Sequence, residues 1–325
     1  MPIMSFELGK SERAEIAPPE SGSRLAAEIH VLPASQCVYA SGEYRVLVAR
    51  RLQIPGVMNE IGRLRELSFR AASEGTGNAR DIDAFDDIYQ HLFVWHGASE
   101  QILGAYRLCM TDVVRRERGA EALYTKTLFR YDEAFLDALG PALELGRSFV
   151  RPEYQGAGRV LALLWRGIAH LLAARPRYRT LFGPVSISSA YSDEARRLIA
   201  SRLCRGPHRH PLFDKVEALR PLGPPREPHP GLDEEARSLS KRVAELEPDH
   251  KGLPVLVREY VKLGGQFLAF SLDPEFCDAM DGLVAVDLDR TKPKLLALYM
   301  GEENYGHFCR SRRSPRPDAS HPVAP

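Results

Sequence analysis

Two charged residues lie inside an otherwise apolar segment of this chain. The segment runs Glu-Leu-Gly-Arg-Ser-Phe-Val from Glu144 to Val150 and places Arg147 three positions after Glu144. Charge within an apolar strand is costly unless it is paired or used in chemistry. A buried carboxylate with a raised pKa can take a proton from an amine and prepare it to attack an acyl group. We expect Glu144 to be this general base, with Arg147 beside it; the alternative is a buried ion pair between Glu144 and Arg147 or Arg107.

A glycine-rich turn follows this segment directly. Arg151-Pro152-Glu153-Tyr154-Gln155-Gly156-Ala157-Gly158 ends the apolar strand at a proline and leads into a long apolar stretch. This order brings unpaired backbone N–H groups and the positive end of a helix to one place, which suits a phosphate of an acyl carrier. Backbone N–H groups also stabilise the oxyanion of a tetrahedral intermediate. The amides expected to serve the carrier and the oxyanion are those of Phe149, Val150, Arg151, Gln155, Gly156 and Gly158.

A second group of charged residues precedes the strand. It consists of Arg65, Asp83, Asp86 and Arg107. Arg107 is flanked by apolar residues, so it must face a cleft or find a partner. Paired aspartates suit a cationic substrate group, and an arginine binds a carboxylate bidentately. We expect these residues to bind the substrate; the alternative is surface and turn charge.

An arginine cluster follows the apolar stretch. Arg175, Arg177 and Arg179 stand around Pro176. Such a cluster can dock the acidic helix of a carrier protein, and the alternative is solvated surface.

The remaining polar candidates are weaker. The hydroxyls of Tyr154, Ser188 and Tyr191 are candidates to protonate a leaving thiolate. His208 and His210 lie in a proline-rich stretch without carboxylate or cysteine partners, so we predict no metal site.

The elements that must position these residues can be read from hydrophobic spacing. The sequence predicts antiparallel strands over 91–95 and 102–108, and a mixed sheet with helices on both faces. Further strands are predicted over 44–52, 144–150, 181–187, 266–272 and 283–288, and helices over 58–72, 158–174, 193–203, 233–246 and 255–263.

Changes of composition divide the chain into segments. Proline, glycine and serine without periodicity indicate disorder, and alternating apolar residues indicate a core. The predicted segments are a largely disordered N-terminal arm (1–40), a core (41–205), a Pro/His-rich excursion with a polar helix (206–252), a C-terminal part completing the core domain (253–309) and a basic disordered tail (310–325).

The bulk composition bounds the class of protein. The chain has 325 residues, 44% of them hydrophobic, and a formal net charge of +1, which argues against a nucleic-acid binder. Its five cysteines show no disulfide or metal spacing, which favours a reducing, cytoplasmic compartment. The apolar run Val160–Ala174 is too short for a membrane span. Any contact with the inner membrane is expected to be peripheral.

The glycine turn resembles a known family motif. The pattern Val150-x-Pro152-x-Tyr154-Gln155-Gly156-Ala157-Gly158 is similar to the acyl-carrier-binding motif of the GNAT acyltransferase superfamily, with Val160 where a second small residue is usual. This resemblance implies an α/β fold with a GNAT-like mixed, mostly antiparallel twisted sheet flanked by helices and a C-terminal α/β extension.

Other segments resemble one branch of that superfamily, the ornithine-acyl carrier protein N-acyltransferases of ornithine lipid biosynthesis, some labelled haemolysin-like. The resemblance implies transfer of a (3-hydroxy)fatty acyl group from acyl carrier protein to the α-amine of L-ornithine, giving lyso-ornithine lipid. It implies no bound cofactor, with the acyl-phosphopantetheine of acyl carrier protein as donor. A more distant similarity is to acyl-homoserine lactone synthases. The segments that carry the resemblance are 83–87, 91–94, 104–108, 144–148, 163–168, 181–183, 253–255, 260–264, 273–276 and 283–287.

Three alternatives stay open from the sequence. One is acylation of another amine, such as glycine, another amino acid or homoserine lactone. Another is a membrane-surface, haemolysin-like protein without catalysis. The third is a regulator that binds acyl carrier protein without consuming its acyl group.

Overall fold

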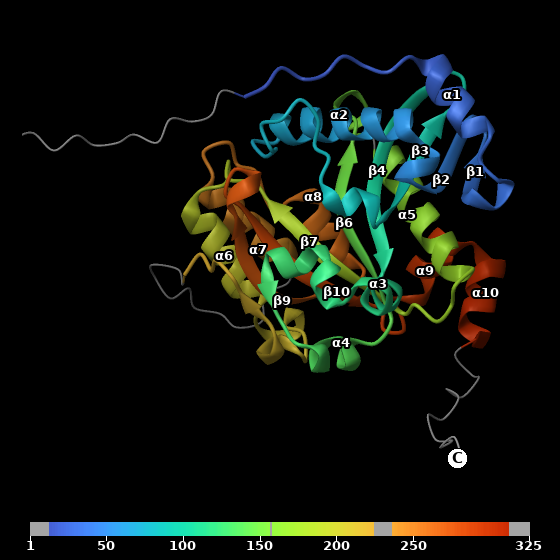
Figure 1. The fold of residues 1–325 in the computed structure, drawn as a ribbon. Coiled ribbons are helices and arrows are strands. Elements are labelled where there is room, and N and C mark those ends of the chain that lie inside the picture. The colour runs from blue at the N-terminus through green and yellow to red at the C-terminus, as the bar shows by residue number, and fades with distance from the viewer. Residues whose placement is uncertain (1–12, 157, 224–235, 312–325) are drawn as a thin grey trace, which may run out of the picture.

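The computed structural model describes residues 13–156, 158–223 and 236–311. Within these residues a twisted sheet has the strand order β1-β2-β3-β4-β6-β7-β10-β9 (Figure 1). Every neighbouring pair is antiparallel except β6 and β7, which are parallel. The mixed, mostly antiparallel sheet is therefore confirmed. The strands are β1 (Cys37–Ser41), β2 (Tyr44–Arg50), β3 (Gln90–His96), β4 (Gln101–Met110), β6 (Ala142–Val150), β7 (Thr180–Ile187), β9 (Gln266–Asp273) and β10 (Ala279–Asp287).

One face of the sheet is covered by the apolar helix that follows the glycine turn. This helix, α5, puts Leu164, Trp165 and Ile168 against the largest hydrophobic cluster. It begins after Gly158, whose left-handed backbone (φ 67°) suits glycine, and ends before Arg175-Pro176. The helices associated with this cluster are α5 (Arg159–Ala173), α6 (Asp193–Leu203), α7 (Ala236–Leu246), α8 (Val255–Lys262), α9 (Pro293–Met300) and α10 (Glu302–Arg310).

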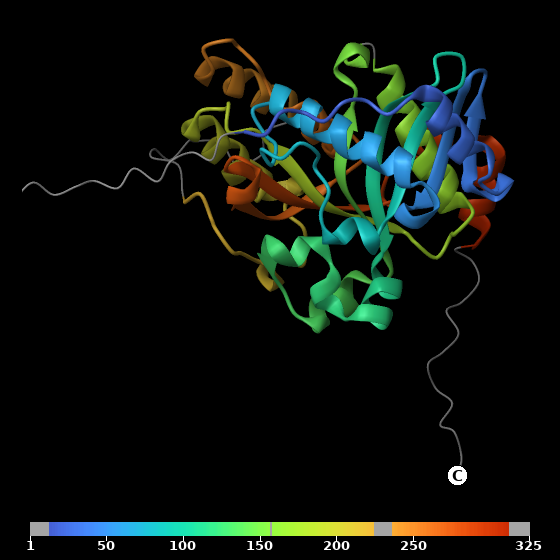
Figure 2. The ribbon, with the colours of Figure 1, turned by 45° about the horizontal axis from the view of Figure 1, so that its top comes forward.

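Two smaller clusters cover the opposite face. Ala105 belongs to one and Cys109 to the other, and residues that alternate along β4 face the same side. The first lies under α1 (Gly22–His30) and α2 (Pro55–Ala71). The second lies under the teal and green segment with α3 (Thr111–Arg118), β5 (Phe129–Arg130) and α4 (Glu133–Leu139), which projects below the sheet in Figure 2. Strand β5 pairs with β8 (Glu217–Ala218).

The N-terminal arm is more ordered than expected. Residues 13–40 lie against the core, and 22–30 form α1. Leu25 and Ile29 are buried against α2, and the Glu28 carboxylate accepts hydrogen bonds from the Gly56 and Val57 backbone N–H groups at 2.8 and 2.9 Å. The prediction of a largely disordered arm is thus corrected for residues 13–40, because tertiary packing stabilises this short helix; residues 1–12 lie outside the described part of the chain.

The expected elements of the core are confirmed within a few residues, and β10 begins earlier than predicted, at Ala279. The sequence predicted no element between 110 and 141, where the structure has α3 and α4. The start of the polar helix at 233 and the tail beyond 311 lie outside the described residues.

Candidate active site

The sheet splits between its two parallel strands. Ala142–Glu144 pair with Thr180–Phe182, and the pairing then ends. At the split, a Cβ on Gly183 would lie 2.0 Å from the Leu145 carbonyl oxygen, so only glycine permits this approach. Beyond it, β7 continues beside β10 while β6 continues beside β4. The split leaves space between two strands that carry backbone polar groups.

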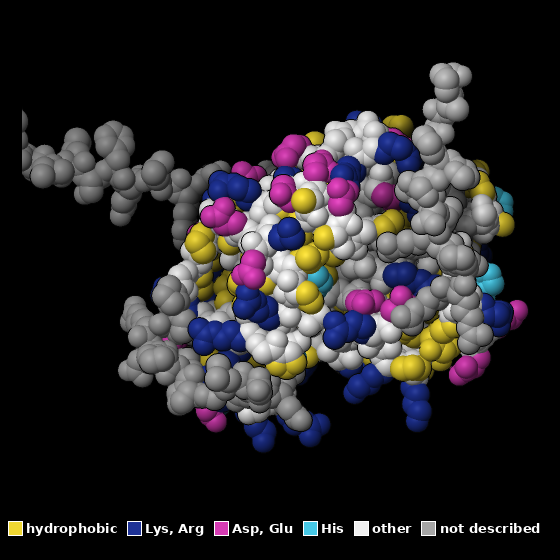
Figure 3. Space-filling model, turned by 90° about the horizontal axis from the view of Figure 1, so that it is seen from below, with side chains coloured by type: hydrophobic (Ala, Val, Ile, Leu, Met, Phe, Trp, Pro, Cys, Tyr) yellow, Lys and Arg dark blue, Asp and Glu magenta, His cyan; other side chains and the backbone are white. Residues whose placement is uncertain are grey.

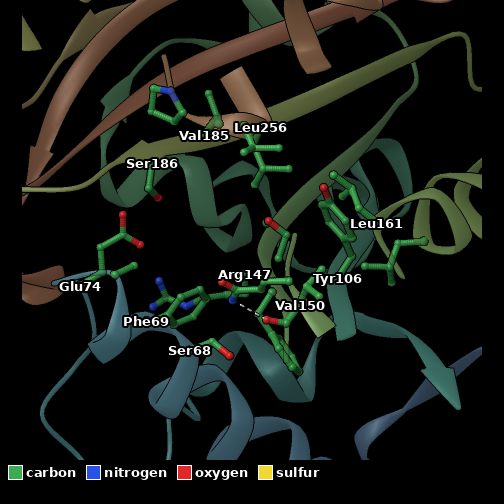
Figure 4. A pocket seen from close by; sticks show the side chains of 18 of the residues that line it. Ser68, Phe69, Glu74, Tyr106, Arg147, Val150, Leu161, Val185, Ser186 and Leu256 are labelled. Carbon is green, nitrogen blue, oxygen red and sulfur yellow. Dashed lines mark hydrogen bonds between the residues drawn. The ribbon is translucent and has the colours of Figure 1, made fainter. Parts of the chain in front are cut away.

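A cavity of about 600 Å³ occupies this split. Its walls come from 146–150 of β6 and 184–186 of β7, with α2, α5, α8 and β10 closing it. Figure 4 shows its two ends: Glu74, Ser186 and Arg147 on one side, and Tyr106 and Leu161 on the other. The cavity is therefore polar at one end and mainly apolar at the other.

Arg147 faces the polar end because β6 contains a bulge. Ala105 opposes Phe149 and Arg107 opposes Gly146, so one residue of β4 faces two residues of β6. Arg147 has a positive φ of 47° there. Its guanidinium lies over the Tyr124 ring and forms ion pairs with Asp81 at 3.3 Å and Asp83 at 3.6 Å. The expected site residue Arg147 thus lines the cavity.

Glu144 does not line the cavity. Its carboxylate points to the opposite side of β6, where it accepts hydrogen bonds from the Tyr89 hydroxyl at 2.6 Å and the Thr125 backbone N–H at 2.9 Å. The Cys109 thiol donates a longer bond of 3.5 Å. Burial raises the pKa of Glu144, while these donors oppose the rise. The expectation that Glu144 faces the acyl group is corrected, since the acid is enclosed and supports the Tyr89 and Thr125 segments.

The second predicted group comes together but forms a closed network. Arg65 donates to Asp86 at 2.8 Å, and Arg107 contacts Asp83 at 2.5 Å and Asp86 at 3.3 Å. Burial favours neutral Asp86, but Arg65 and Arg107 hold its pKa below the usual value. None of the four lines the cavity. Their predicted role in direct substrate binding is corrected to a structural one, because each charge has a partner within the protein. The neighbouring His91 has its pKa lowered to about 3 by burial and then by Arg65.

Two carboxylates at the polar end were missed from the sequence. Glu74 lies in the turn after α2, and Asp281 lies in β10; both are buried and line the cavity. No lysine, arginine or histidine of the described residues forms an ion pair with either carboxylate. Asp281 accepts a hydrogen bond of 2.7 Å from the Ser186 hydroxyl. An acid in the otherwise apolar run from 279 to 286 was the available signal, and it was lost because the strand was predicted to begin at 283.

Burial perturbs both of these acids. Burial, followed by the charge of Asp281, raises the pKa of Glu74 to about 8, while Arg147 opposes the rise. Burial raises the pKa of Asp281 to about 7; the Ser186 hydroxyl opposes the rise, the Asp273 carboxylate adds to it, and Arg147 opposes it. Values in this range allow exchange of a proton with an amine near neutral pH.

The glycine turn lies at the other end of the cavity. Gly156 and Gly158 line it and have positive φ values of 94° and 67°. The first N–H groups of α5 have no partner within the helix and lie beside this turn. The Arg151 N–H, however, donates to the Leu103 carbonyl at 2.8 Å, and the Gln155 N–H donates to the Pro152 carbonyl at 3.2 Å. These two amides are tied up in the fold, which corrects their predicted role. Phe149 and Val150 line the cavity as part of β6.

The predicted docking arginines lie far from the glycine turn. They follow the end of α5, whose 15 residues span about 22 Å. Arg177 pairs with Asp112, while Arg179 pairs with Asp289 at 3.2 Å and covers the Phe308 ring. Docking of a carrier at Arg175, Arg177 and Arg179 stays a prediction, and it would place the docking surface at the opposite end of α5 from the glycine turn. The face seen from below in Figure 3 carries interspersed basic and acidic side chains.

The other candidates have protein partners. Tyr154 donates to Gln101 at 3.2 Å, Ser188 to the Ala72 carbonyl and Tyr191 to the Gly252 carbonyl at 2.8 Å. Of these three, only Tyr154 lines the cavity.

The described residues contain no cluster of three or more potential metal ligands and no helix long and apolar enough to cross a membrane.

Comparison with known proteins gives a consistent picture. Residues 64–166 match the family described as Acetyltransferase (GNAT) domain. A glycine N(alpha)-acyltransferase of Bacteroides thetaiotaomicron is 35% identical over 269 residues, covering 75% of this chain and 77% of that protein. One of Phocaeicola vulgatus is 40% identical over 181 residues (52% and 54%). An L-ornithine N(alpha)-acyltransferase of Brucella abortus is 28% identical over 306 residues (84% and 98%).

Among solved structures, an N-acyl amino acid synthase from uncultured soil microbes aligns with 79% of this chain and 97% of its own, at 11% identity and a TM-score of 0.37. This weak alignment supports no further conclusion. The sequence matches and the split sheet with its glycine turn agree with one another. The chain is an acyltransferase and belongs to the GNAT family, in the group that includes the glycine and L-ornithine N(alpha)-acyltransferases.

Proposed function

We propose that this protein transfers a (3-hydroxy)fatty acyl group from acyl carrier protein to the α-amine of L-ornithine, giving lyso-ornithine lipid. The observation that carries the proposal is the polarity of the cavity. One end has an apolar wall and a glycine turn, and the other has buried carboxylates without ion-pair partners in the described residues. A lipid thioester and a cationic amine are the substrates that match these two ends.

The donor fits the end with the glycine turn. The positive end of α5 and its free N–H groups suit the phosphate of phosphopantetheine. The acyl chain and the arm require an apolar wall, which Val150, Leu161 and Leu256 supply. The split between β6 and β7 lets an extended arm lie between the strands. No bound cofactor is needed in this scheme, because the carrier brings the acyl group.

The acceptor fits the polar end. Ornithine has two ammonium groups and one carboxylate, so its net charge is positive. In this proposal Arg147, which lines the cavity in addition to its ion pairs with Asp81 and Asp83, binds the carboxylate, and Glu74 and Asp281 bind an ammonium group. A net positive substrate supplies the charge that the two buried carboxylates lack. Asp273, whose pKa is also raised by burial, stands beside this end and adds to its acidity.

Glycine is the second candidate acceptor. The two relatives at 35% and 40% identity are glycine N(alpha)-acyltransferases, whereas the ornithine relatives are 28–34% identical. Glycine has a single ammonium group and no net charge at neutral pH. It therefore neutralises less of the acidic end, and we rank it below ornithine on the geometry. Because the chain is an acyltransferase, we do not retain the non-catalytic alternatives.

A competition assay tests this function. The full-length protein is incubated with 3-hydroxyacyl carrier protein and equal concentrations of isotopically distinct ornithine, glycine, lysine and homoserine lactone, and the acylated products are quantified by mass spectrometry. Acyl-coenzyme A and acyl carrier protein without the 3-hydroxyl serve as alternative donors. We expect N-acyl ornithine to dominate, with the carrier as preferred donor. Dominant N-acyl glycine would overturn the assignment of ornithine, and equal use of acyl-coenzyme A would overturn that of the carrier.

A further inference from the structure

We propose that Glu74 and Asp281 together form the proton acceptor that deprotonates the attacking amine. This inference rests on the proposed function and adds the residues that perform its proton transfer. It replaces Glu144, the acid that the strand motif suggested.

Glu74 lies in a turn that is held by hydrogen bonds with three parts of the chain: α2, the segment after β7 and the segment before β10. Its own N–H donates to the Phe69 carbonyl at 2.8 Å. The Ser189 hydroxyl, which follows β7, donates to the Ser73 carbonyl at 3.2 Å, and the Cys277 thiol donates to the Gly75 carbonyl at 3.3 Å. The turn after α2 is therefore fixed on both sides of Glu74. In Figure 4 its carboxylate points toward the same space as Ser186 and Arg147.

Asp281 lines the cavity from strand β10. Its Cα partner in the ladder is Ser186 of β7, whose hydroxyl donates to one carboxylate oxygen. Asp281 is 3% exposed and lines the cavity. A buried carboxylate with one hydroxyl donor and no ion pair retains unused acceptor capacity. That capacity is directed at a cavity that a substrate can fill.

Two interacting acids suit this proton transfer better than one enclosed acid. The Asp281 charge acts on Glu74, so the first proton to leave the pair makes the second harder to remove. Both carboxylates line the same cavity, and burial raises the pKa of each above its usual value. Such a pair can bind an ammonium group and still accept a proton from it. Glu144, by contrast, already has three donors and no access to the cavity.

The step balances in atoms and charge. The ammonium group of the acceptor gives one proton to the carboxylate pair, and the nitrogen lone pair forms a C–N bond to the thioester carbonyl carbon. The tetrahedral intermediate then breaks its C–S bond, with the electron pair leaving on sulfur. The second proton on nitrogen neutralises the thiolate. The products are an amide and a free thiol, and the carboxylate pair later releases its proton to solvent.

The pH dependence of kcat/KM for the amine tests this inference. The full chain and the variants Asp281→Asn and Glu74→Gln are compared between pH 5.5 and 9.5 with saturating acyl donor. Asp214→Asn, which changes an exposed aspartate paired with Arg209, is the matched control. Product identity is confirmed in the wild type by mass spectrometry, and folding of each variant is followed by circular dichroism.

We expect each cavity variant to lower kcat/KM at pH 8 by about 100-fold, within the usual range for loss of a general base. The acid limb of Asp281→Asn should also move to lower pH, because Glu74 loses its charged neighbour. The control should match the wild type.

Wild-type kcat/KM and pH profiles in both cavity variants would overturn the inference and leave the proposed function intact. Unfolding of both variants would assign the acids a structural role and would also overturn it. Absence of any N-acyl amino acid product in the wild type would instead reject the proposed function.

Discussion

Two regions of this molecule bury acidic side chains, and they differ in whether these side chains form ion pairs. Behind the sheet, Asp86 lies 2.8 Å from Arg65 and 3.3 Å from Arg107, and its pKa is held low by these arginines. In the split of the sheet, Glu74 and Asp281 have no ion-pair partner in the described residues, and burial raises their pKa values. In the first region each acid is paired with an arginine. In the second region Arg147, which is itself paired with Asp81 and Asp83, only partly offsets the effect of burial on the two acids.

The difference shows that buried charge does not by itself identify a catalytic residue. A network whose members satisfy one another positions the chain and has nothing left for a substrate. Buried carboxylates that have no ion pair destabilise the empty protein, and positive charge from a ligand offsets this cost. Four predictions test this contrast, from the largest effect to the smallest.

The largest effect is expected where the closed network is broken. Arg107→Met removes one cation and leaves Asp83 and Asp86 short of a partner. Loss of one member of a buried pair typically costs about 3–5 kcal/mol. We expect the free energy of unfolding in urea to fall by that amount. Activity should fall in proportion to the fraction of folded protein. A loss below about 1 kcal/mol would show that the network is not structural.

In the split of the sheet, removal of a charge should raise the free energy of unfolding, whereas removal of Arg107 should lower it. Burial raises the pKa of Asp281 to about 7 in the folded protein, well above the usual value of an aspartate, so the native state binds this proton more tightly than the unfolded chain does. This contribution is present below about pH 4 and is lost as the pH rises through 7. At pH 8.5 the free energy of unfolding of Asp281→Asn should therefore exceed that of the wild type by up to about 4 kcal/mol. Thermal unfolding should show this as a higher melting temperature for the variant. No advantage over the wild type at pH 8.5, or one that is larger at pH 5, would contradict the raised pKa of Asp281.

Glu144→Gln should affect folding more than catalysis. The glutamine oxygen can still accept the Thr125 N–H, but its amide group meets the Tyr89 hydroxyl and the Cys109 thiol in place of an acceptor. We expect a loss of about 1–3 kcal/mol in stability. The kcat of the folded fraction should stay within about threefold of the wild type. A 100-fold fall in kcat with intact folding would restore Glu144 as the base.

The smallest effect is expected at the far end of α5. The double variant with Arg175→Ala and Arg177→Ala changes side chains that lie about 22 Å from the glycine turn, the length of the 15-residue helix. We expect the KM for acyl carrier protein to stay within about twofold and stability to change by less than about 1 kcal/mol. A tenfold rise in this KM would show that the carrier docks there after all.

Much of the fold could be predicted from local patterns. The strand over 144–150, the glycine turn and the helix that follows were read from apolar spacing and from the proline and glycine positions. Helix α1 was missed because Leu25 and Ile29 give too short a pattern, and its stability comes from contacts with α2. The segment between 110 and 141 gave no clear periodicity for the same reason, since its short helices depend on tertiary packing.

The sequence by itself determined the strand-turn-helix order around Val150 and the family to which it points, because chain neighbours and hydrophobic periods fix such features. The tertiary structure alone decided which acid faces the cavity. A bulge at Arg147 changes the alternation of β6, and alternation cannot tell which side of a sheet becomes the site. Glu74 and Asp281 come from distant parts of the chain, and their meeting depends on long-range packing that sequence spacing does not encode.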